Sequence, residues 1–142
     1  TSGTMLFTFG CYGSKPGQFH YPECLATFSD GYIAVSDKEN CRVQVFDDQG
    51  KFSHLIPKHG SGDLSTHKHH INGPMGMCCD KLDRLYVCDS GSNRVHIFAR
   101  DGQWLWSSPE NPSKSHFCSP TGIAIDGEGS VYVAGDNCVQ IF

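Results

Sequence analysis

The chain repeats one pattern three times, and this repetition constrains its fold more than any other feature of the sequence. Each copy starts at a proline and ends its third segment at a phenylalanine. The prolines are Pro22, Pro74 and Pro120, and the phenylalanines are Phe46, Phe98 and Phe142. The prolines are 52 and 46 residues apart, and the phenylalanines are 52 and 44 apart. Self-similarity at such a period indicates a repeat architecture.

Each repeat predicts four short strands. The first follows the proline, the second is a run of Ile, Val and Tyr that ends near an aspartate, the third is Val-x-Val/Ile-Phe, and the fourth follows a glycine turn. Val43 and Val45 alternate with polar residues, as do Val95 and Ile97, which predicts strands with one buried face. Asp-Gly and Gln-Gly pairs between the runs favour hairpin turns. Four-stranded antiparallel units of this period stack as propeller blades, so we expect an all-β fold.

The composition supports strands and gives no sign of a basic or membrane-spanning protein. Gly and Pro together number 23, which is typical of short strands joined by tight turns. Only 18% of residues are charged, which argues against a disordered polyelectrolyte. The formal net charge is −4, whereas nucleic-acid-binding domains usually carry a basic excess. No apolar run approaches 18 residues, so we expect no membrane contact, and no signal-peptide pattern is visible.

Eight cysteines are many for 142 residues, and they leave two interpretations open. No pair has the Cys-x-x-Cys spacing of a zinc or redox site. Several cysteines fall in predicted strands, where a reduced thiol packs as a small hydrophobe. We therefore expect a cytoplasmic protein with free thiols. The alternative is an extracellular binding module whose cysteines are paired.

Two turn segments and one link carry a family resemblance. The turns are Asp37-Lys38-Glu39-Asn40-Cys41-Arg42-Val43 and Asp89-Ser90-Gly91-Ser92-Asn93-Arg94-Val95, and the link runs from Phe9 to Phe19. This pattern resembles the NHL repeat, in which Pro-x-Gly-Ile-Ala-Val is followed by Val-Asp-x-x-Asn-x-Arg-Val-x-Val-Phe. The pattern also resembles the C-terminal propeller of tripartite-motif (TRIM) NHL proteins. It implies NHL-type β-propeller blades, about three of them, forming half of a six-bladed ring.

Two departures from the pattern occur, one in the first repeat and one in the turn of the third. Cys24 stands where the other repeats have Gly76 and Gly122. The third repeat has a turn two residues shorter and lacks the arginine.

The resemblance also divides the chain. Residues 1–18 are expected to hold the end of a preceding blade, with Phe7–Phe9 as its last strand, and the link that follows. The three repeats are expected at 19–56, 71–106 and 117–142, the last without its fourth strand. Inter-blade loops are expected at 57–70 and 107–116. An incomplete set of blades leaves open edges, through which the chain could associate with itself, and two copies could close one ring.

In both full repeats an aspartate precedes an arginine by five residues. These are Asp37 with Arg42 and Asp89 with Arg94. In a tight hairpin such residues face each other, and an arginine fork can bond a carboxylate. We expect these pairs to stabilise the hairpins.

The resemblance implies a non-enzymatic interaction propeller that binds a protein or RNA. It would be the recognition part of a TRIM-NHL-like ubiquitin ligase or of a post-transcriptional regulator, with any RING region outside this chain. Loops commonly carry function, so we expect the contact residues on the loop face. The candidates are Tyr12, Lys15, His20, Tyr21, Lys38, Asn40, Arg42, Lys68, His69, Asn93 and Arg94. The acidic balance favours a protein partner over RNA.

The enzyme alternative is a metal-dependent NHL-like lyase or hydrolase. Peptidyl-hydroxyglycine amidating lyases are NHL-like propellers that hold zinc with histidines just after the blade prolines, but here those positions are Glu23, Met75 and Thr121. The histidines between residues 54 and 70 match no zinc spacing. We find no nucleophile or phosphate-loop motif and expect no cofactor, metal or enzymatic activity in this chain.

Overall fold

The three repeats form three separate antiparallel sheets in a computed structural model, which describes residues 3–58, 70–108 and 117–142. We call the sheets blades 1, 2 and 3. Blade 1 contains β3 (Pro22–Thr27), β4 (Ile33–Asp37), β5 (Arg42–Phe46) and β6 (Phe52–Ile56); blade 2 contains β7 (Pro74–Cys79), β8 (Leu85–Asp89), β9 (Arg94–Phe98) and β10 (Trp104–Ser107); blade 3 contains β11 (Pro120–Ile125), β12 (Val131–Gly135) and β13 (Cys138–Ile141). The expected all-β class is confirmed, as are four, four and three strands in the three repeats.

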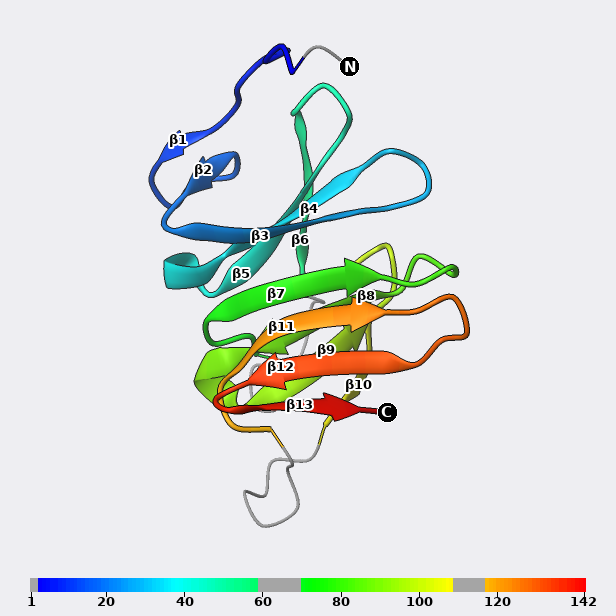
Figure 1. Cartoon of the computed structure of the whole chain (residues 1–142). Helices are drawn as coiled ribbons and strands as arrows, with labels where there is room; N and C mark the ends of the chain where they lie inside the picture. Colours follow the sequence, from blue (N-terminus) through cyan, green and yellow to red (C-terminus); the bar gives the residue numbers. More distant parts are fainter. Residues whose placement is uncertain (1–2, 59–69, 109–116) are drawn as a thin grey trace.

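The blades stack one upon the next through their first strands. Strand β7 packs against β3 on one side and β11 on the other (Figure 1). The turns from the second to the third strand of each blade lie on the left in Figure 1, and the turns from the first to the second strand lie on the right. Two loop faces therefore lie at opposite ends of the strands.

The third strands of blades 1 and 2, β5 and β9, are buried on both faces, which corrects the prediction of one buried face for these two strands. Gln44 and His96 alternate with the apolar residues of β5 and β9, yet both are 0% exposed. On β5, the link covers the second face: Gly17 N–H donates to Gln44 Oε1 at 2.9 Å, and Gln44 Nε2 donates to Gln18 O at 2.7 Å. The polar residues that alternate with the apolar ones on these strands therefore make buried hydrogen bonds and do not face solvent.

The segment Phe7–Phe9 forms no strand, in contrast to the expectation. A strand needs a partner, and no described residue offers one at this place. The Phe9 ring instead packs against Phe46, with ring centroids 5.0 Å apart. The link that follows forms a short parallel pair, β1 (Cys11–Tyr12) with β2 (Gln18–Phe19).

The glycine in the first strand of blade 2 sets how closely blades 2 and 3 approach. A Cβ built on Gly76 would lie 2.5 Å from Thr121 O and 2.9 Å from Gly122 Cα. At the same position of blade 1, the Cys24 thiol contacts the next blade, with Sγ 3.3 Å from Met77 N. The repeat therefore tolerates a side chain between blades 1 and 2 but not between blades 2 and 3.

We expect Gly76→Ala to destabilise the chain by about 1–3 kcal/mol, because the added methyl overpacks a backbone contact. Gly122 is the matched control. A Cβ there meets only Ala134 Cβ at 3.6 Å, an ordinary contact. Gly122→Ala should be neutral or stabilise by up to about 1 kcal/mol, because alanine loses less backbone entropy on folding. Urea unfolding of both variants measures the difference, and equal effects would contradict this account of the blade contact.

All eight cysteines are free, and burial makes several of them unreactive. Burial raises the pKa of the Cys78, Cys79 and Cys88 thiols to about 12 from the ordinary 9.0. Since the thiolate is the nucleophile, these groups stay inert near neutral pH. The structure therefore agrees with thiols packed as small hydrophobes.

Thiol titration at pH 8 tests this. Cys11, Cys118 and Cys138 are exposed and should react quickly with an aromatic disulfide reagent, whereas Cys78, Cys79 and Cys88, whose pKa is raised, should react much more slowly until the chain is denatured. A raised folded-state pKa also means that the stability these thiols contribute is present below pH 9.0 and is lost as the pH rises toward 12. Rapid reaction of all eight thiols in the native chain would contradict the burial.

Candidate protein-interaction face

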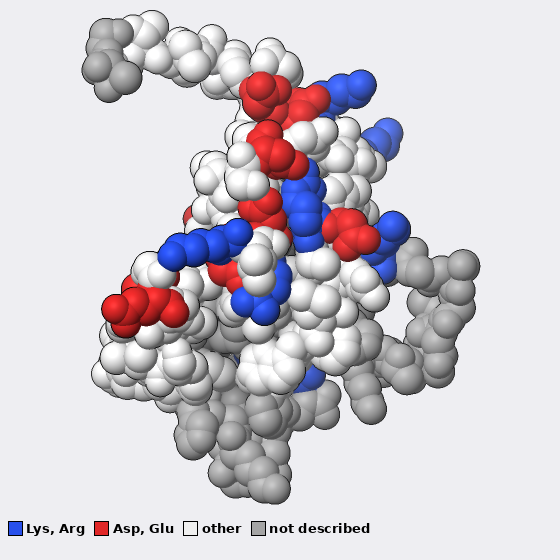
Figure 2. Space-filling view, turned by 90° about the vertical axis from the view of Figure 1, so that its right-hand side faces the viewer, with Lys and Arg blue, Asp and Glu red and all other residues white. Residues whose placement is uncertain are grey.

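One loop face is covered by charges of both signs that pair with each other. Figure 2 shows Lys and Arg side chains interleaved with Asp and Glu on the side where the turns from first to second strands lie. Arg100 Nη2 lies 3.0 Å from Asp30 Oδ2, and the Arg84 and Asp80 side chains are 2.5 Å apart. The Arg100 guanidinium also lies 4.4 Å from the ring centroids of both Phe28 and Tyr32, which ties blade 2 to blade 1. These contacts therefore hold blades 1 and 2 together, and the face presents no patch of a single charge sign.

The opposite face is built from the turns that join the second and third strands. Blades 1 and 2 each place a single 3₁₀ turn there, η1 (Lys38–Asn40) and η3 (Ser90–Ser92). Each turn ends in a left-handed residue, Cys41 at φ 50° and Asn93 at φ 55°. In register, Asp37 faces Arg42 and Asp89 faces Arg94 across these turns.

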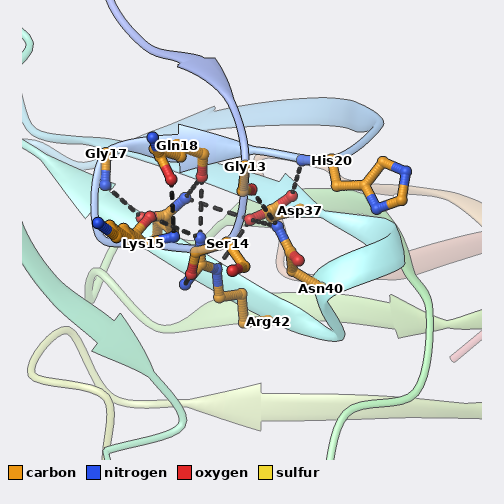
Figure 3. A network of polar contacts seen from close by, with 10 residues as sticks. Gly13, Ser14, Lys15, Gly17, Gln18, His20, Asp37, Asn40 and Arg42 are labelled. Carbon is orange, nitrogen blue, oxygen red and sulfur yellow. Dashed lines mark hydrogen bonds and ion pairs between the residues drawn. The ribbon is translucent and has the colours of Figure 1, made fainter.

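A buried carboxylate joins the first turn to the link. Asp37 is 0% exposed and accepts hydrogen bonds from His20 N–H at 2.7 Å, Arg42 Nε at 2.8 Å and Asn40 Nδ2 at 2.9 Å (Figure 3). Gln44 Nε2 adds a fourth contact at 3.2 Å. The two Asp37 oxygens thereby fix the hairpin and the end of the link together.

The Nη1 and Nη2 groups of Arg42 donate hydrogen bonds to backbone carbonyls of the link. Arg42 Nη1 donates to Ser14 O at 2.7 Å, and Nη2 donates to Lys15 O at 3.0 Å and Gln18 O at 2.8 Å (Figure 3). Asn40 Nδ2 also donates to Gly13 O at 2.9 Å. Asn40 and Arg42, two of the predicted contact residues, are therefore committed to holding the link in place. We call this set of contacts the link clamp.

Blade 2 has a related network with a histidine in it. Asp89 accepts from Asn72 N–H at 3.0 and 2.9 Å, from Ser92 Oγ at 2.5 Å and from His96 Nε2 at 3.2 Å. His96 Nδ1 lies 2.6 Å from Ser107 Oγ. Sequence reasoning missed this Ser–His–Asp series, although a histidine between two apolar residues of a third strand was a signal.

This series has a packing role. His96 and Asp89 are each 0% exposed, so the ring nitrogens do not meet solvent. Ser107 Oγ also accepts the Trp104 Nε1 hydrogen bond at 2.7 Å. A nucleophile needs access to its substrate, and this hydroxyl is occupied by two neighbours. His96 occupies the third-strand position of Gln44, and like Gln44 it contacts the buried aspartate of its own turn.

Three aromatic side chains lie on the outer surface of the link clamp. Tyr12 is 79% exposed and Tyr21 is 67% exposed. His20 lies between them, with ring centroids 5.1 Å from Tyr12 and 5.4 Å from Tyr21. We call Tyr12, His20 and Tyr21 the aromatic cluster. All three were predicted contact residues, and the structure brings them together.

The backbone of Tyr21 is strained. Its φ is 58°, and the matching residues before the other blade prolines are Gly73 at 88° and Ser119 at 43°. A left-handed conformation costs an L-residue with a side chain roughly 1–2 kcal/mol. Lys38 N–H donates to Tyr21 O at 3.2 Å, and Glu39 N–H donates to His20 O at 3.1 Å, so the η1 turn holds this conformation. Backbone strain of this kind clusters at functional sites.

A shallow groove of about 290 Å³ lies between the two 3₁₀ turns, and the η1 turn that lines it also donates to the His20 and Tyr21 carbonyls. It is lined by Lys38, Glu39, Cys41, Asn72, Gly73, Ser90 and Gly91. Lys38 Nζ pairs with Glu23 Oε1 at 3.4 Å. The groove thus presents charged side chains of both signs and glycine backbone.

The remaining predicted residues lie in different places. Lys15 is exposed on the link, and Asn93 Oδ1 accepts Ser119 N–H at 2.8 Å, which joins the blade 2 turn to blade 3. Arg94 begins β9 opposite Asp89. Lys68 and His69 lie outside the described residues. Over residues 3–58, 70–108 and 117–142, no group of three His, Cys, Asp or Glu side chains is arranged to hold a metal ion, and no helix is long and apolar enough to span a membrane.

The sheets and their stacking define a partial β-propeller, and comparison with known sequences supplies the family. The NHL repeat model matches residues 19–46 and 72–98. NHL-repeat-containing protein 4 of Mus musculus is 30% identical over 115 residues, which are 80% of this chain and 75% of that protein. The chain belongs to the NHL-repeat family.

Larger relatives share the same repeats. RING finger protein nhl-1 of Caenorhabditis elegans is 33% identical over 126 residues, which cover 88% of this chain. E3 ubiquitin-protein ligase TRIM32 of Homo sapiens is 28% identical over 134 residues, which cover 90% of this chain. This chain spans only 12% of the first protein and 20% of the second.

Solved structures agree with the fold. Hydrazine synthase of Kuenenia stuttgartiensis matches with a TM-score of 0.67 at 18% identity, covering 100% of this chain and 35% of that chain. A gluconolactonase of Xanthomonas campestris matches with a TM-score of 0.62 at 19% identity, covering 89% of this chain and 39% of that chain. At this identity the likeness concerns the propeller fold alone.

Proposed function

We propose that the face formed by the link and by the turns η1 and η3, which we call the link-and-turn face, binds a protein partner through the aromatic cluster and the groove between the two turns. The observation that carries this proposal is the exposure of Tyr12 and Tyr21 on a backbone fixed by the link clamp. Rigid, exposed tyrosines lose little entropy on binding and are enriched at the energetic centres of protein interfaces. The strained Tyr21 backbone, held by the η1 turn, presents the ring outward before any partner arrives.

The charges of this face favour a protein over RNA. RNA binding draws most of its affinity from cations that neutralise phosphates. Here Lys38 is paired with Glu23, and Arg42 is committed to the link clamp. Glu39 lines the same groove. A peptide with both polar and apolar groups complements this mixture better than a polyanion does.

The relatives support a recognition role within a larger protein. RING finger protein nhl-1 and E3 ubiquitin-protein ligase TRIM32 match this chain over 12% and 20% of their own length. We propose that this chain recognises a substrate or partner for a TRIM-NHL-like ligase or a post-transcriptional regulator, and has no enzymatic activity of its own. The eight free thiols support a reducing, cytoplasmic setting.

A peptide display selection against the immobilised chain, followed by fluorescence anisotropy, tests the proposal. Selected peptides should bind the wild type and lose about tenfold or more in affinity in Tyr12→Ala and in Tyr21→Gly. The glycine variant keeps the left-handed backbone and relieves its strain, so its stability should not fall. Leu82→Ala, an exposed apolar residue of the β7–β8 turn, is the control and should bind as the wild type does.

A pool of single-stranded RNA at low salt completes the experiment. We expect no binding of the pool. RNA binding that weakens as salt rises, together with no selected peptide, would replace the protein proposal by an RNA one. Peptides that bind all three variants as well as the wild type would show that the partner uses another surface.

A further inference from the structure

We propose that Cys118 and Cys138 form a reversible disulfide, which joins the segment that enters blade 3 to the turn between β12 and β13. Blades 1 and 2 make the corresponding connection with a buried aspartate. The proposal concerns the third turn alone and does not depend on the protein partner proposed above.

In blades 1 and 2, the aspartate that ends the second strand holds the segment that enters the blade. His20 N–H donates to Asp37 Oδ1 at 2.7 Å. Asn72 N–H donates to Asp89 Oδ2 at 2.9 Å. Each donor lies two residues before the blade proline, and each aspartate is 0% exposed. The two full repeats therefore make this connection in the same way.

Blade 3 has a glycine at the position of the aspartate. Gly135 pairs with Pro120 in register, as the aspartates pair with the other two blade prolines. A Cβ built on Gly135 would lie 2.7 Å from Cys118 O and 2.8 Å from Ser119 O. The entering segment therefore lies directly against the turn, and no carboxylate fits between them.

One cysteine lies on each side of this contact. Cys118 lies two residues before the blade proline, where the other blades have their N–H donor. Cys138 begins β13, as Arg42 begins β5. Cys138 pairs with Gly135 across a two-residue turn, and its Sγ lies 3.7 Å from Gly135 O. Both cysteines therefore contact the same glycine, one from the entering segment and one from the third strand.

The two cysteines also line one small pocket. Its volume is about 10 Å³, and Phe117, Val133 and Gln140 are among the other residues that line it. A space of this size holds no more than about one water molecule, so the side chains around it are near neighbours. Over residues 3–58, 70–108 and 117–142, no third His, Cys, Asp or Glu joins them in an arrangement that could hold a metal ion. The pair therefore favours a disulfide over a metal site.

Both thiols are accessible, and the backbone beside Cys118 is fixed. Cys118 and Cys138 are exposed, unlike the buried Cys88. Ser119 N–H donates to Asn93 Oδ1 at 2.8 Å, which holds the entering segment against the turn of blade 2. Thiol–disulfide exchange needs an accessible thiolate and a second thiol within reach. These two cysteines meet both conditions.

A small-molecule disulfide such as oxidised glutathione supplies the oxidant. The Cys118 thiolate attacks one sulfur of that disulfide, which breaks its S–S bond, forms a mixed disulfide and releases one glutathione thiolate. The Cys138 thiolate then attacks the Cys118 sulfur, which forms the protein disulfide and releases the second glutathione thiolate. Two protein thiols lose two protons and two electrons, and one oxidised glutathione becomes two reduced ones.

The disulfide closes a loop of chain between residues 118 and 138. Such a crosslink restricts the unfolded chain and thereby stabilises the folded one. It ties the entering segment to the third turn, as the aspartates do in blades 1 and 2. Excess reduced glutathione reopens it, so this connection responds to the redox state of the surroundings, whereas the connections through Asp37 and Asp89 do not.

Peptide mapping after redox equilibration tests the proposal. The folded chain is incubated with reduced and oxidised glutathione at several ratios, the remaining thiols are alkylated, and the digest is analysed by mass spectrometry. We expect one crosslinked peptide pair, joined through Cys118 and Cys138, and alkylation of the other six cysteines. The urea midpoint of the oxidised chain should exceed that of the reduced chain by about 1–2 M.

Three single variants complete the experiment. Cys138→Ser should keep one glutathione on Cys118, and Cys118→Ser should keep one on Cys138, with no crosslink and no rise of the urea midpoint in either. Cys11→Ser is the matched control, because Cys11 is exposed but lies in β1, and this variant should crosslink as the wild type does. Absence of the Cys118–Cys138 pair at every glutathione ratio overturns the proposal. A crosslink at another pair of cysteines, or an equal rise of the midpoint in Cys138→Ser, overturns it too.

Discussion

Asp37→Ala should destabilise the chain by about 3–5 kcal/mol, because it leaves a largely buried arginine without its carboxylate. The side chains of Asp37 and Arg42 are 0% and 14% exposed, and their atoms lie 2.8 Å apart. The same substitution removes the acceptor for His20 N–H and for Asn40 Nδ2. Urea unfolding followed by circular dichroism measures the loss.

Asp48→Ala is the control for this prediction. Asp48 is an exposed carboxylate in the turn between β5 and β6. Its removal should change the free energy of unfolding by no more than about 0.5 kcal/mol. An Asp37 variant as stable as the control would show that the link clamp does not stabilise the fold.

Phe98→Ala should cost about 3–5 kcal/mol, because it removes a large side chain from the cluster between blades 1 and 2. Phe98 is 0% exposed and shares that cluster with Val45, Ile56 and Leu85. The residues around it belong to two blades, so the cavity cannot collapse without moving one blade relative to the other. The free energy of unfolding from urea titration is again the measurement.

Phe142→Ala is the matched comparison, because Phe142 occupies the same position in the third repeat as Phe98 in the second but is exposed. Phe142 is 56% exposed, and its ring contacts Phe117 with centroids 5.2 Å apart. Its removal should cost less than about 1.5 kcal/mol, the scale of a single aromatic pair. Equal losses at the two positions would contradict the assignment of the core to the blade 1–blade 2 contact.

The repeat architecture could be predicted because its signals are periodic. Each proline marked the start of a first strand, and each Val-x-Val/Ile-Phe run marked a third strand that the structure contains. The five-residue spacing of Asp37 and Arg42 predicted their cross-strand register. These features depend on local spacing, which a single sequence displays.

What could not be predicted depends on contacts between distant segments. Alternation alone placed Gln44 and His96 toward solvent, because nothing in the sequence shows that the link covers Gln44 or that Asp89 and Ser107 bind His96. Phe7–Phe9 has the composition of a strand, but a strand forms only with a partner, and here its aromatic rings pack on Phe46.

The candidate site was predicted in part for the same reason. Tyr12, His20 and Tyr21 were among the contact residues expected on the loop face, and the structure brings their rings together. Asn40 and Arg42 were expected to face a partner, but their donors bind Asp37 and the link carbonyls. The groove between the two 3₁₀ turns needs two blades to exist, so neither repeat alone could reveal it.

Hydrogen–deuterium exchange of the chain with a selected peptide tests the central claim most directly. The claim is that this NHL-repeat chain recognises its partner through the link-and-turn face. We expect the bound peptide to slow exchange in residues 12–21, 38–41 and 72–73, and to leave the turns at 28–31 and 80–83 unchanged. Protection of those opposite turns, with none in the link, would contradict the claim.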